Sequence, residues 1–308
     1  MKGNPNKWQK LGRIICPKDE IPWMSTFAGP AFAKCTDQSS VFEIIMAGRD
    51  RQNRSQLGAF KVNLNTPTES YDVTPEPIFS FGELGAFDEN GVSYPWVVTQ
   101  EKKDFLFYNG WMPSVLTPFQ IHLGLAVRNE GGKFKRISRA PILERTNDDY
   151  LSTGSVCILI ENNTWKMWYT SFRKWGKESG DHKHYYNIKY AESNDGINWR
   201  RENRVCIDFK NCSEYAICRP SVIRIDDLYH MWYSYRGEQY RIGYAISEDG
   251  IAWQRLDEFA GIDISPSGWD SNAICYSHVF QHKDTLFMLY NGNNYGQEGL
   301  GIARLKLF

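Results

Sequence analysis

An excess of charge of one sign and a long apolar run are both missing from this sequence. Its 308 residues contain 36 Lys and Arg against 36 Asp and Glu, so the formal net charge is zero. A neutral chain without a long basic run is not expected to bind nucleic acid or an acidic membrane. No stretch of about 18 apolar residues is present to span a bilayer, and Met1 to Lys10 is polar, unlike a secretory signal. We therefore expect a cytoplasmic protein with no nucleic-acid or membrane partner.

The motifs of several common sites are absent as well. No Cys-x-x-Cys pair occurs, which disfavours a zinc ribbon, and neither a Gly-rich phosphate loop nor a Ser/His/Asp signature stands out. The seven cysteines are an odd number, and several, such as Cys157, lie in apolar strand-like runs, which indicates buried thiols rather than disulfides. We expect no cofactor and no metal. Asp181 to His184 contains two histidines, but its charged surroundings favour a solvated loop.

Aromatic residues are plentiful by contrast. Phe, Tyr and Trp make up 15% of the chain, and hydrophobic residues as a whole make up 42%. This apolar content is sufficient for a folded core and excludes disorder as the main state. Because aromatic side chains favour both β-strands and sugar-binding clefts, the composition points toward a β protein.

An internal repeat defines the structural unit. The pattern Tyr-Ala-x-Ser-x-Asp-Gly-x-x-Trp occurs at Tyr190 to Trp199 and again at Tyr244 to Trp253. Aromatic strand-like segments, Trp165 to Tyr169 and Tyr229 to Tyr233, precede the two copies. The Asp-Gly pair favours a tight turn, since Gly accepts positive φ without steric cost. Each unit is thus predicted to have three short strands, a turn, and a fourth strand that opens with Trp.

Weaker copies extend the repeat over the whole chain. The first strands of five units are predicted near Gly29, Pro95, Ser155, Pro220 and Cys275. The fifth unit ends at Phe308 after three strands, whereas Lys7 to Leu11 resembles Ala252 to Leu256. The N-terminal strand is therefore expected to pair beside Leu300 to Leu305 and close a ring. We predict an all-β, five-bladed β-propeller in which residues 1–308 form a single domain.

In a propeller, the loops that lead into the innermost strands surround the mouth of the central channel. These loops carry the acidic residues Asp88, Asp148, Asp149, Glu214 and Asp270. Paired carboxylates around one pocket are what glycoside cleavage requires, because one gives a proton to the leaving oxygen and another activates water or attacks the sugar. The alternative is that these residues only cap turns.

Cationic, aromatic and amide side chains are expected around the same mouth. Such groups bind sugar hydroxyls and carboxylates or cover the apolar faces of a sugar ring. The predicted substrate-binding residues are Arg49, Arg54, Trp111, Arg173, Arg219, Arg236, Asp270, His278 and Asn291. The alternative for each is a turn residue with a solvated side chain. Arg219 is expected to point into the channel and to pair with Glu214 or Asp149, whereas Trp168 and Trp232 are expected in the core.

The repeated motif at Tyr190 to Trp199 and Tyr244 to Trp253 resembles that of the five-bladed propeller glycosidases, which include glycoside hydrolase families 43, 32 and 130. As architecture, the resemblance covers essentially the whole chain, and it is nearest to relatives found among bacterial surface-polysaccharide genes. It implies a catalytic base Asp in the first blade, a tuning Asp in the third and an acid Glu in the fourth.

Carried over to this sequence, the resemblance makes Glu214 the acid and Asp149, or its neighbour Asp148, the tuning residue. The first blade has no Asp in Phe27 to Pro30, so Asp88, or else Asp50, is left as the base. In an inverting hydrolase, the Glu214 and Asp88 carboxyl groups are expected roughly 6.5–9.5 Å apart. The predicted function is cleavage or transfer of a glycosyl unit. The alternative is a sugar-binding or biosynthetic propeller that has lost the base.

Overall fold

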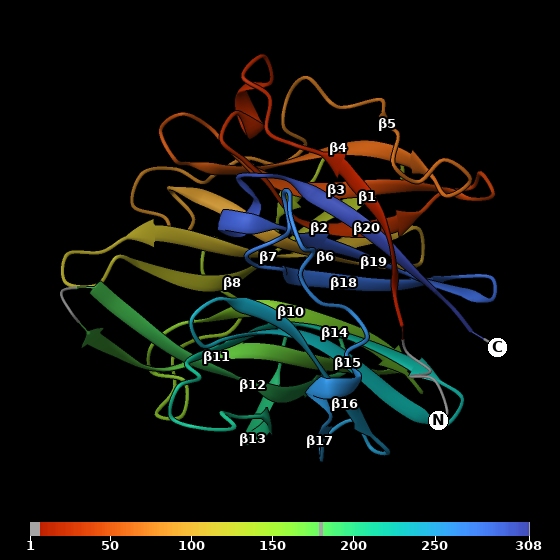
Figure 1. Cartoon of the computed structure of the whole chain (residues 1–308). Helices are drawn as coiled ribbons and strands as arrows, with labels where there is room; N and C mark the ends of the chain where they lie inside the picture. Colours follow the sequence, from red (N-terminus) through yellow and green to blue (C-terminus); the bar gives the residue numbers. More distant parts are fainter. Residues whose placement is uncertain (1–6, 179–180, 308) are drawn as a thin grey trace, which may run out of the picture.

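The computed structural model describes residues 7–178 and 181–307, and it confirms an all-β protein (Figure 1). The helices of the described chain are three short 3-10 turns: η1 (Pro22–Met24), η2 (Asp257–Phe259) and η3 (Asn293–Gly296). The strands form one four-stranded and two eight-stranded sheets. Within the described residues, no helix has the length and hydrophobicity that crossing a membrane requires.

The first eight-stranded sheet is built from the N-terminal part of the chain. Two antiparallel runs meet in it through a parallel pair between Ser55 and Gly91. Its strands are β2 (Phe27–Cys35), β3 (Val41–Arg49), β4 (Ser55–Asn63), β5 (Ser70–Tyr71), β6 (Gly91–Gln100), β7 (Lys103–Pro113), β8 (Phe119–Asn129) and β9 (Lys135–Arg136).

The second eight-stranded sheet repeats this arrangement with the middle of the chain. A parallel pair between Tyr186 and Ala216 joins its two antiparallel runs. Its strands are β10 (Thr153–Glu161), β11 (Thr164–Glu178), β12 (Asp181–Ser193), β13 (Arg200–Ile207), β14 (Ala216–Ile225), β15 (Leu228–Arg236), β16 (Tyr240–Ser247) and β17 (Gln254–Arg255).

The four-stranded sheet brings the two ends of the chain together. Its order is β1 (Gln9–Ile15), β20 (Leu300–Lys306), β19 (Thr285–Asn291) and β18 (Cys275–His282). β1 is antiparallel to β20, with Gln9 opposite Arg304 and Ile15 opposite Leu300, and the red and blue strands lie side by side in Figure 1. Trp8 is 5% exposed and packs edge to face on Trp232 with 5.6 Å between ring centroids. The predicted pairing of the N-terminal strand with Leu300 to Leu305 is confirmed.

The two copies of the repeat form matching turns. The Asp249 carboxylate accepts hydrogen bonds from the backbone N–H groups of Ile251 and Ala252, and Asp195 does the same for Ile197 and Asn198. The Trp253 indole donates to the Gly250 carbonyl, as the corresponding Trp199 does to Gly196. The repeated motif therefore specifies a turn and its anchor, which is a structural role.

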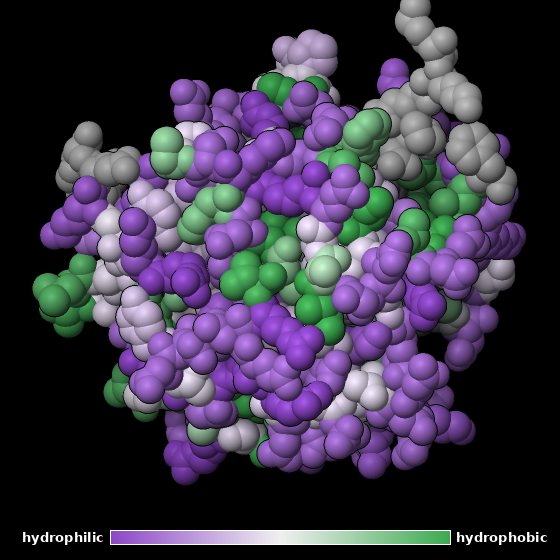
Figure 2. All heavy atoms as spheres, turned by 90° about the horizontal axis from the view of Figure 1, so that it is seen from below, coloured by the Kyte–Doolittle hydropathy of each residue, from purple (hydrophilic) through white to green (hydrophobic). Residues whose placement is uncertain are grey.

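Large aromatic side chains fill the interior. Trp168 is fully buried and Trp232 is 1% exposed, so both belong to the core as predicted. All seven cysteines are free, and Cys157, Cys206, Cys218 and Cys275 are buried, in agreement with the expectation of reduced thiols. On the face shown in Figure 2, hydrophilic side chains predominate and hydrophobic ones gather in small patches toward the middle.

Candidate functional site

A cavity of about 450 Å³ lies where the first strands of several units meet. Its lining includes Gly29 of β2, Tyr94 of β6, Ser155 of β10 and Tyr276 of β18. Each has a positive φ, between 49° and 115°, and each lies at a register shift between its strand and the next. Arg219 of β14, with φ 52° at the equivalent register shift, is the fifth member of this set. Backbone held in this region re-aims side chains and is often found at functional sites.

Four tyrosines from four strands line one part of the cavity. The Tyr186 and Tyr240 hydroxyls share a short hydrogen bond, and the ring centroids of Tyr240 and Tyr276 are 5.6 Å apart. The Tyr94 and Tyr276 ring centroids are 5.1 Å apart. Burial raises the pKa of each of these hydroxyls above its usual range, so they are neutral at pH 7 and act as hydrogen-bond donors and acceptors.

Two arginines, Arg49 and Arg236, also line the cavity. The Arg49 guanidinium lies 4.5 Å from the Phe27 ring centroid and donates to Asn53 Oδ1 at 2.9 Å. The Arg236 guanidinium lies 5.5 Å from the ring centroid of Tyr240 and 5.6 Å from that of Tyr295. Among the side chains that the structure describes, neither guanidinium forms an ion pair with a carboxylate. Burial lowers the pKa of Arg49, but the group stays protonated.

The remaining ionisable groups do not balance this charge. No Asp or Glu occurs among the described residues that line the cavity. His184 lines it, and burial together with the nearby Arg236 lowers the pKa of its imidazole to about 4. His184 is therefore neutral at pH 7, and the two guanidinium groups leave the cavity positively charged.

Three buried polar atoms beside the cavity have no protein partner. They are Asn109 Nδ2, Ser155 Oγ and Thr170 Oγ1, whose residues line the cavity and are 1%, 3% and 1% exposed. Asn109 is held in place because its Oδ1 accepts a hydrogen bond of 2.6 Å from the Ser155 N–H. Buried polar groups normally find partners, so these atoms are available to a ligand or to water.

The structure places the predicted catalytic residues Asp88 and Asp149 outside the cavity lining, in ion pairs. Asp88 accepts from Arg136 at 2.7 Å and from the Tyr108 hydroxyl at 3.1 Å. Asp149 accepts from Lys189 and the Tyr169 hydroxyl, both at 2.9 Å.

The predicted substrate-binding residue Asp270 has the same kinds of partner. Its carboxylate accepts hydrogen bonds from Lys10 at 2.7 Å and from the Tyr290 hydroxyl at 3.0 Å. In all three cases the tyrosine comes 20 residues after the carboxylate and lies in the second strand of the unit. These contacts anchor the loop that leads into each first strand. Asp270 does not line the cavity, and its carboxylate is paired with Lys10.

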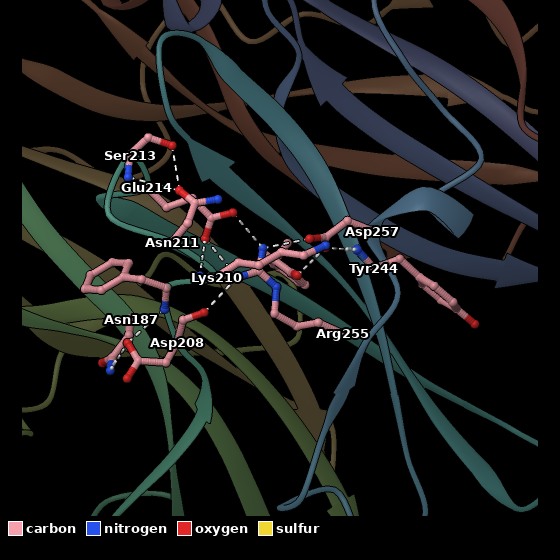
Figure 3. A network of polar contacts seen from close by, with 11 residues as sticks. Asn187, Asp208, Lys210, Asn211, Ser213, Glu214, Tyr244, Arg255 and Asp257 are labelled. Atoms are coloured by element: carbon pink, nitrogen blue, oxygen red, sulfur yellow. Dashed lines mark hydrogen bonds and ion pairs between the residues drawn. The ribbon is translucent and has the colours of Figure 1, made fainter.

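Glu214, the predicted acid, also lies outside the cavity lining, in the network of Figure 3. Arg255 donates to both of its carboxylate oxygens, at 2.9 and 3.1 Å, and also to Asp257 at 2.7 Å. The Lys210 N–H donates to Glu214 at 2.8 Å. Glu214 thus accepts three hydrogen bonds within the protein, two from Arg255 and one from the Lys210 N–H. The roles of Glu214, Asp88 and Asp149 in catalysis stay predictions.

Of the predicted substrate-binding residues, the cavity brings together Arg49, Trp111 and Arg236. The Trp111 indole is fixed by a 2.6 Å hydrogen bond to Ser55 Oγ. The others lie elsewhere. Arg54 pairs with Asp50 at 2.9 Å, and Arg173 is exposed away from the lining. Asn291 is buried beneath Gly29, where its Nδ2 donates to the Ala28 carbonyl at 2.7 Å.

Arg219 and His278 lie in the interior and not in the cavity lining. Arg219 is fully buried, and its Nη2 donates to the carbonyls of Ala31 and Pro95 at 2.8 and 3.1 Å. The expected pairing with Glu214 or Asp149 is wrong, because those carboxylates are bound by Arg255 and Lys189. The His278 ring packs against Phe32 and Trp96, with centroid distances of 4.4 and 5.1 Å, so it is part of the core.

His184 is a cavity residue that the sequence did not indicate, because the charged residues of Asp181 to His184 favoured a solvated loop. β11 and β12 instead continue their pairing to Glu178 and Asp181. The His184 ring stacks on Tyr186, with 5.1 Å between centroids, and contacts Trp175 at 5.6 Å. The aromatic residues in Phe172 to Trp175 and His184 to Tyr186 are the signal for this extended hairpin, because aromatic side chains favour strands. The four cavity tyrosines were also missed.

Comparison with known proteins places the chain among glycosidase-like proteins. Residues 158–298 match the model of glycoside hydrolase family 130, described as beta-1,4-mannooligosaccharide phosphorylase. The "Uncharacterized protein MT1551" of Mycobacterium tuberculosis is 38% identical over 299 residues, which are 97% of this chain and 99% of that protein.

Solved structures agree with this assignment at the level of the fold. A structure described as "Glycoside hydrolase" has a TM-score of 0.73 at 16% identity and covers 97% of this chain and 92% of its own. A second structure has a TM-score of 0.72 at 15% identity and covers 99% of this chain and 95% of its own. Its description reads that the GH130 family of mannoside phosphorylases contains glycoside hydrolases that target beta-1,2 mannosidic linkages in Candida mannan. The chain belongs to the same family as the mycobacterial protein MT1551 and is glycosidase-like.

Proposed function

We propose that this protein is a carbohydrate-active enzyme that binds a glycosyl unit in the cavity and cleaves or transfers it. The observation that carries the proposal is the set of three unpartnered polar atoms, Asn109 Nδ2, Ser155 Oγ and Thr170 Oγ1, in a cavity lined by aromatic rings. Sugars present hydroxyl groups at their edges and C–H surfaces on their faces, which match these two features. The volume of about 450 Å³ falls in the range of roughly 300–1,000 Å³ typical of small-molecule sites.

We also propose that residues 1–308 form a single five-bladed propeller, the fold that supports this function. The first strands of the five units contact one another in turn: β2 contacts β6, β6 contacts β10, β10 contacts β14, β14 contacts β18, and β18 contacts β2. The five matching register shifts with positive φ also support fivefold repetition. The cavity would then lie at one end of the axis.

The proposed acid–base roles require a change in the pairs that now hold the carboxylates. Glu214 as acid must carry a proton on a carboxyl group whose two oxygens now accept hydrogen bonds from Arg255, so this contact would have to change. For Asp88 to act as the base, its ion pair with Arg136 must break. Asp149 would adjust the acidity of Glu214 while it stays paired with Lys189. Ligand-induced movement of the loops that carry these residues would supply such a change.

The same ion pairs favour a second candidate function. A sugar-binding or biosynthetic propeller needs no protonated acid and keeps Glu214 beside Arg255 as a structural contact. Mannosides are a first substrate class to test in either case, because the matching family model is described by a mannooligosaccharide phosphorylase. A cytoplasmic setting and a surface-polysaccharide substrate belong to the proposal as well.

The variant Thr170→Val tests the binding site. Val has nearly the same shape as Thr, and Thr170 Oγ1 has no protein partner to lose, so folding should be unaffected. A sugar that binds wild type, found by calorimetric titration of mono- and oligosaccharides, should bind about tenfold more weakly to this variant, the cost of one hydrogen bond. Thr66→Val, at an exposed position, is the matched control. Equal affinity for all three proteins would show that the sugar does not bind in this cavity.

The variant Glu214→Gln separates the two candidate functions. Both proteins are assayed for release of sugar from aryl glycosides and oligosaccharides, with and without inorganic phosphate, while sugar binding is followed in parallel. Turnover by wild type that is lost in Glu214→Gln supports the enzyme. Equal binding with no turnover in either protein supports the binding module.

A further inference from the structure

We infer that the sugar bound in this cavity carries a covalently attached oxyanion, a carboxylate or a phosphate ester, held between Arg49 and Arg236. The inference rests on the proposed function and adds the chemical class of the ligand. It starts from two positive charges in the cavity, Arg49 and Arg236, that no described acidic side chain of the lining neutralises.

The charge balance is unusual for a buried site. Arg49 and Arg236 line the cavity, and among its described lining residues there is no Asp or Glu to offset them. The acidic residues near the cavity are already engaged: Asp88 with Arg136, Asp149 with Lys189, and Glu214 with Arg255. A guanidinium that loses part of its hydration needs an anionic or hydrogen-bonding partner in its place. Arg49 donates to Asn53 Oδ1 and Arg236 to the Glu238 carbonyl, but among the described residues neither has an anionic partner, and an anionic ligand would supply one.

Both arginines lie in the lining of the same cavity, together with aromatic rings. Tyr276 is in ring contact with Tyr94 and with Tyr240, and the Arg236 guanidinium lies over the Tyr240 ring. These three tyrosines form a contiguous aromatic group in the cavity that reaches the Arg236 guanidinium. Aromatic faces hold each guanidinium plane in place, so that its N–H fork is pre-organised for a carboxylate or phosphate group. The neutral tyrosine hydroxyls are additional donors to the same oxyanion.

The rest of the lining indicates that the oxyanion is attached to a sugar. Asn109 Nδ2, Ser155 Oγ and Thr170 Oγ1 are partners for hydroxyl groups, and inorganic phosphate would leave them unused. Trp111 and Phe119 line the cavity as apolar surfaces on which a pyranose ring can lie. An acidic sugar uses both sets of groups at once, and a neutral sugar leaves the arginines without a partner.

The test compares acidic and neutral sugars of the same stereochemistry. Hexuronic acids and hexose 6-phosphates are titrated against wild type next to the parent hexoses, with acetate and inorganic phosphate as anions without a sugar. The same titrations are carried out on Arg49→Met, Arg236→Met and the control Arg173→Met. Met keeps an unbranched apolar stem without the charge, and Arg173 is an exposed arginine outside the lining. Thermal melting of each variant checks folding, and Arg49→Gln or Arg236→Gln replaces the corresponding Met variant if that variant fails to fold.

The expected result is that at least one acidic sugar binds wild type tenfold or more tightly than its neutral parent. This ratio should fall at least fivefold in Arg49→Met and Arg236→Met and stay unchanged in Arg173→Met. Uronate preference identifies a carboxylate ligand, and 6-phosphate preference identifies a phosphate ester. Equal binding of acidic and neutral sugars overturns this inference and leaves the proposed function standing. Binding of inorganic phosphate or acetate as tight as that of the acidic sugars also overturns it, and no sugar binding at all overturns both.

Discussion

Asp149 shows how strongly a single carboxylate is tied into this molecule. It accepts hydrogen bonds from Ser171 at 2.6 Å and from Lys189 at 2.9 Å, and Lys189 is fully buried. Asp149→Asn should therefore lower the free energy of unfolding by about 3–5 kcal/mol, because it leaves the Lys189 charge uncompensated. Urea denaturation measures the loss. Asp148→Asn, at the exposed neighbouring position, should change it by less than about 1 kcal/mol. Equal effects of the two substitutions would contradict the structural role.

The same residue predicts a pH dependence of stability. Burial alone would raise the pKa of Asp149, but the hydrogen bonds from Ser171 and Lys189 outweigh it and lower this pKa in the folded state. The contribution is thus fully present above the unfolded pKa of about 4 and is lost as the pH falls through the lower, folded value. Denaturation curves at pH 6 to pH 2.5 should show a shallower acid-induced loss of stability in Asp149→Asn than in wild type. An identical slope for both would contradict the assigned pKa direction.

At the residue scale, the sequence predicted part of the site. Arg49, Trp111 and Arg236 were recognised because they follow second-strand segments, where side chains reach the rim. The partners of the carboxylates were not predicted, because Arg255 lies 41 residues from Glu214 and Arg136 lies 48 residues from Asp88. Only folding reveals that these charges meet. The tyrosines were not recognised because their orientation depends on positive φ at Tyr94 and Tyr276, which residue type does not indicate.

At the element scale, β1 is the strand whose removal should matter most. It covers β20 along its length, and Trp8 before it packs on Trp232. Deletion of residues 1–12 should expose the edge of β20 and remove a buried Trp, whose loss alone costs about 3–5 kcal/mol. We expect a markedly lower melting temperature and aggregation on heating. A deleted protein that melts like wild type would contradict the role of β1.

The elements themselves were predictable to a large extent. The repeated Asp-Gly turns and the similarity of Lys7 to Leu11 with Ala252 to Leu256 led to the strand order of the repeats and to the β1–β20 pair, and the structure confirms that pairing. The long β11–β12 hairpin was not predicted. Its charged residues suggested solvent, but Lys183 lies over the Tyr215 ring with 4.5 Å between the ammonium and the centroid, so polar and aromatic side chains pack together there.

At the scale of the whole molecule, the first strands are the frame of the cavity. Gly29, Tyr94, Ser155 and Tyr276 bring four strands to it, while Arg219 from the fifth crosses to the carbonyls of Ala31 and Pro95 beneath it. This arrangement explains how a chain with low identity to solved glycoside hydrolases, 16% for one of them, keeps their fold. The repeated strands preserve the frame, and the residues at its positions set the ligand.

The most direct test of the account is a crystal structure of the protein with the tightest-binding sugar from the titrations. We expect electron density for the sugar in the cavity, with hydroxyl groups within hydrogen-bond distance of Asn109, Ser155 or Thr170. An acidic group of the sugar should contact Arg49 and Arg236. Density for the sugar at any other place, with this cavity filled only by solvent, would contradict the assignment of the site.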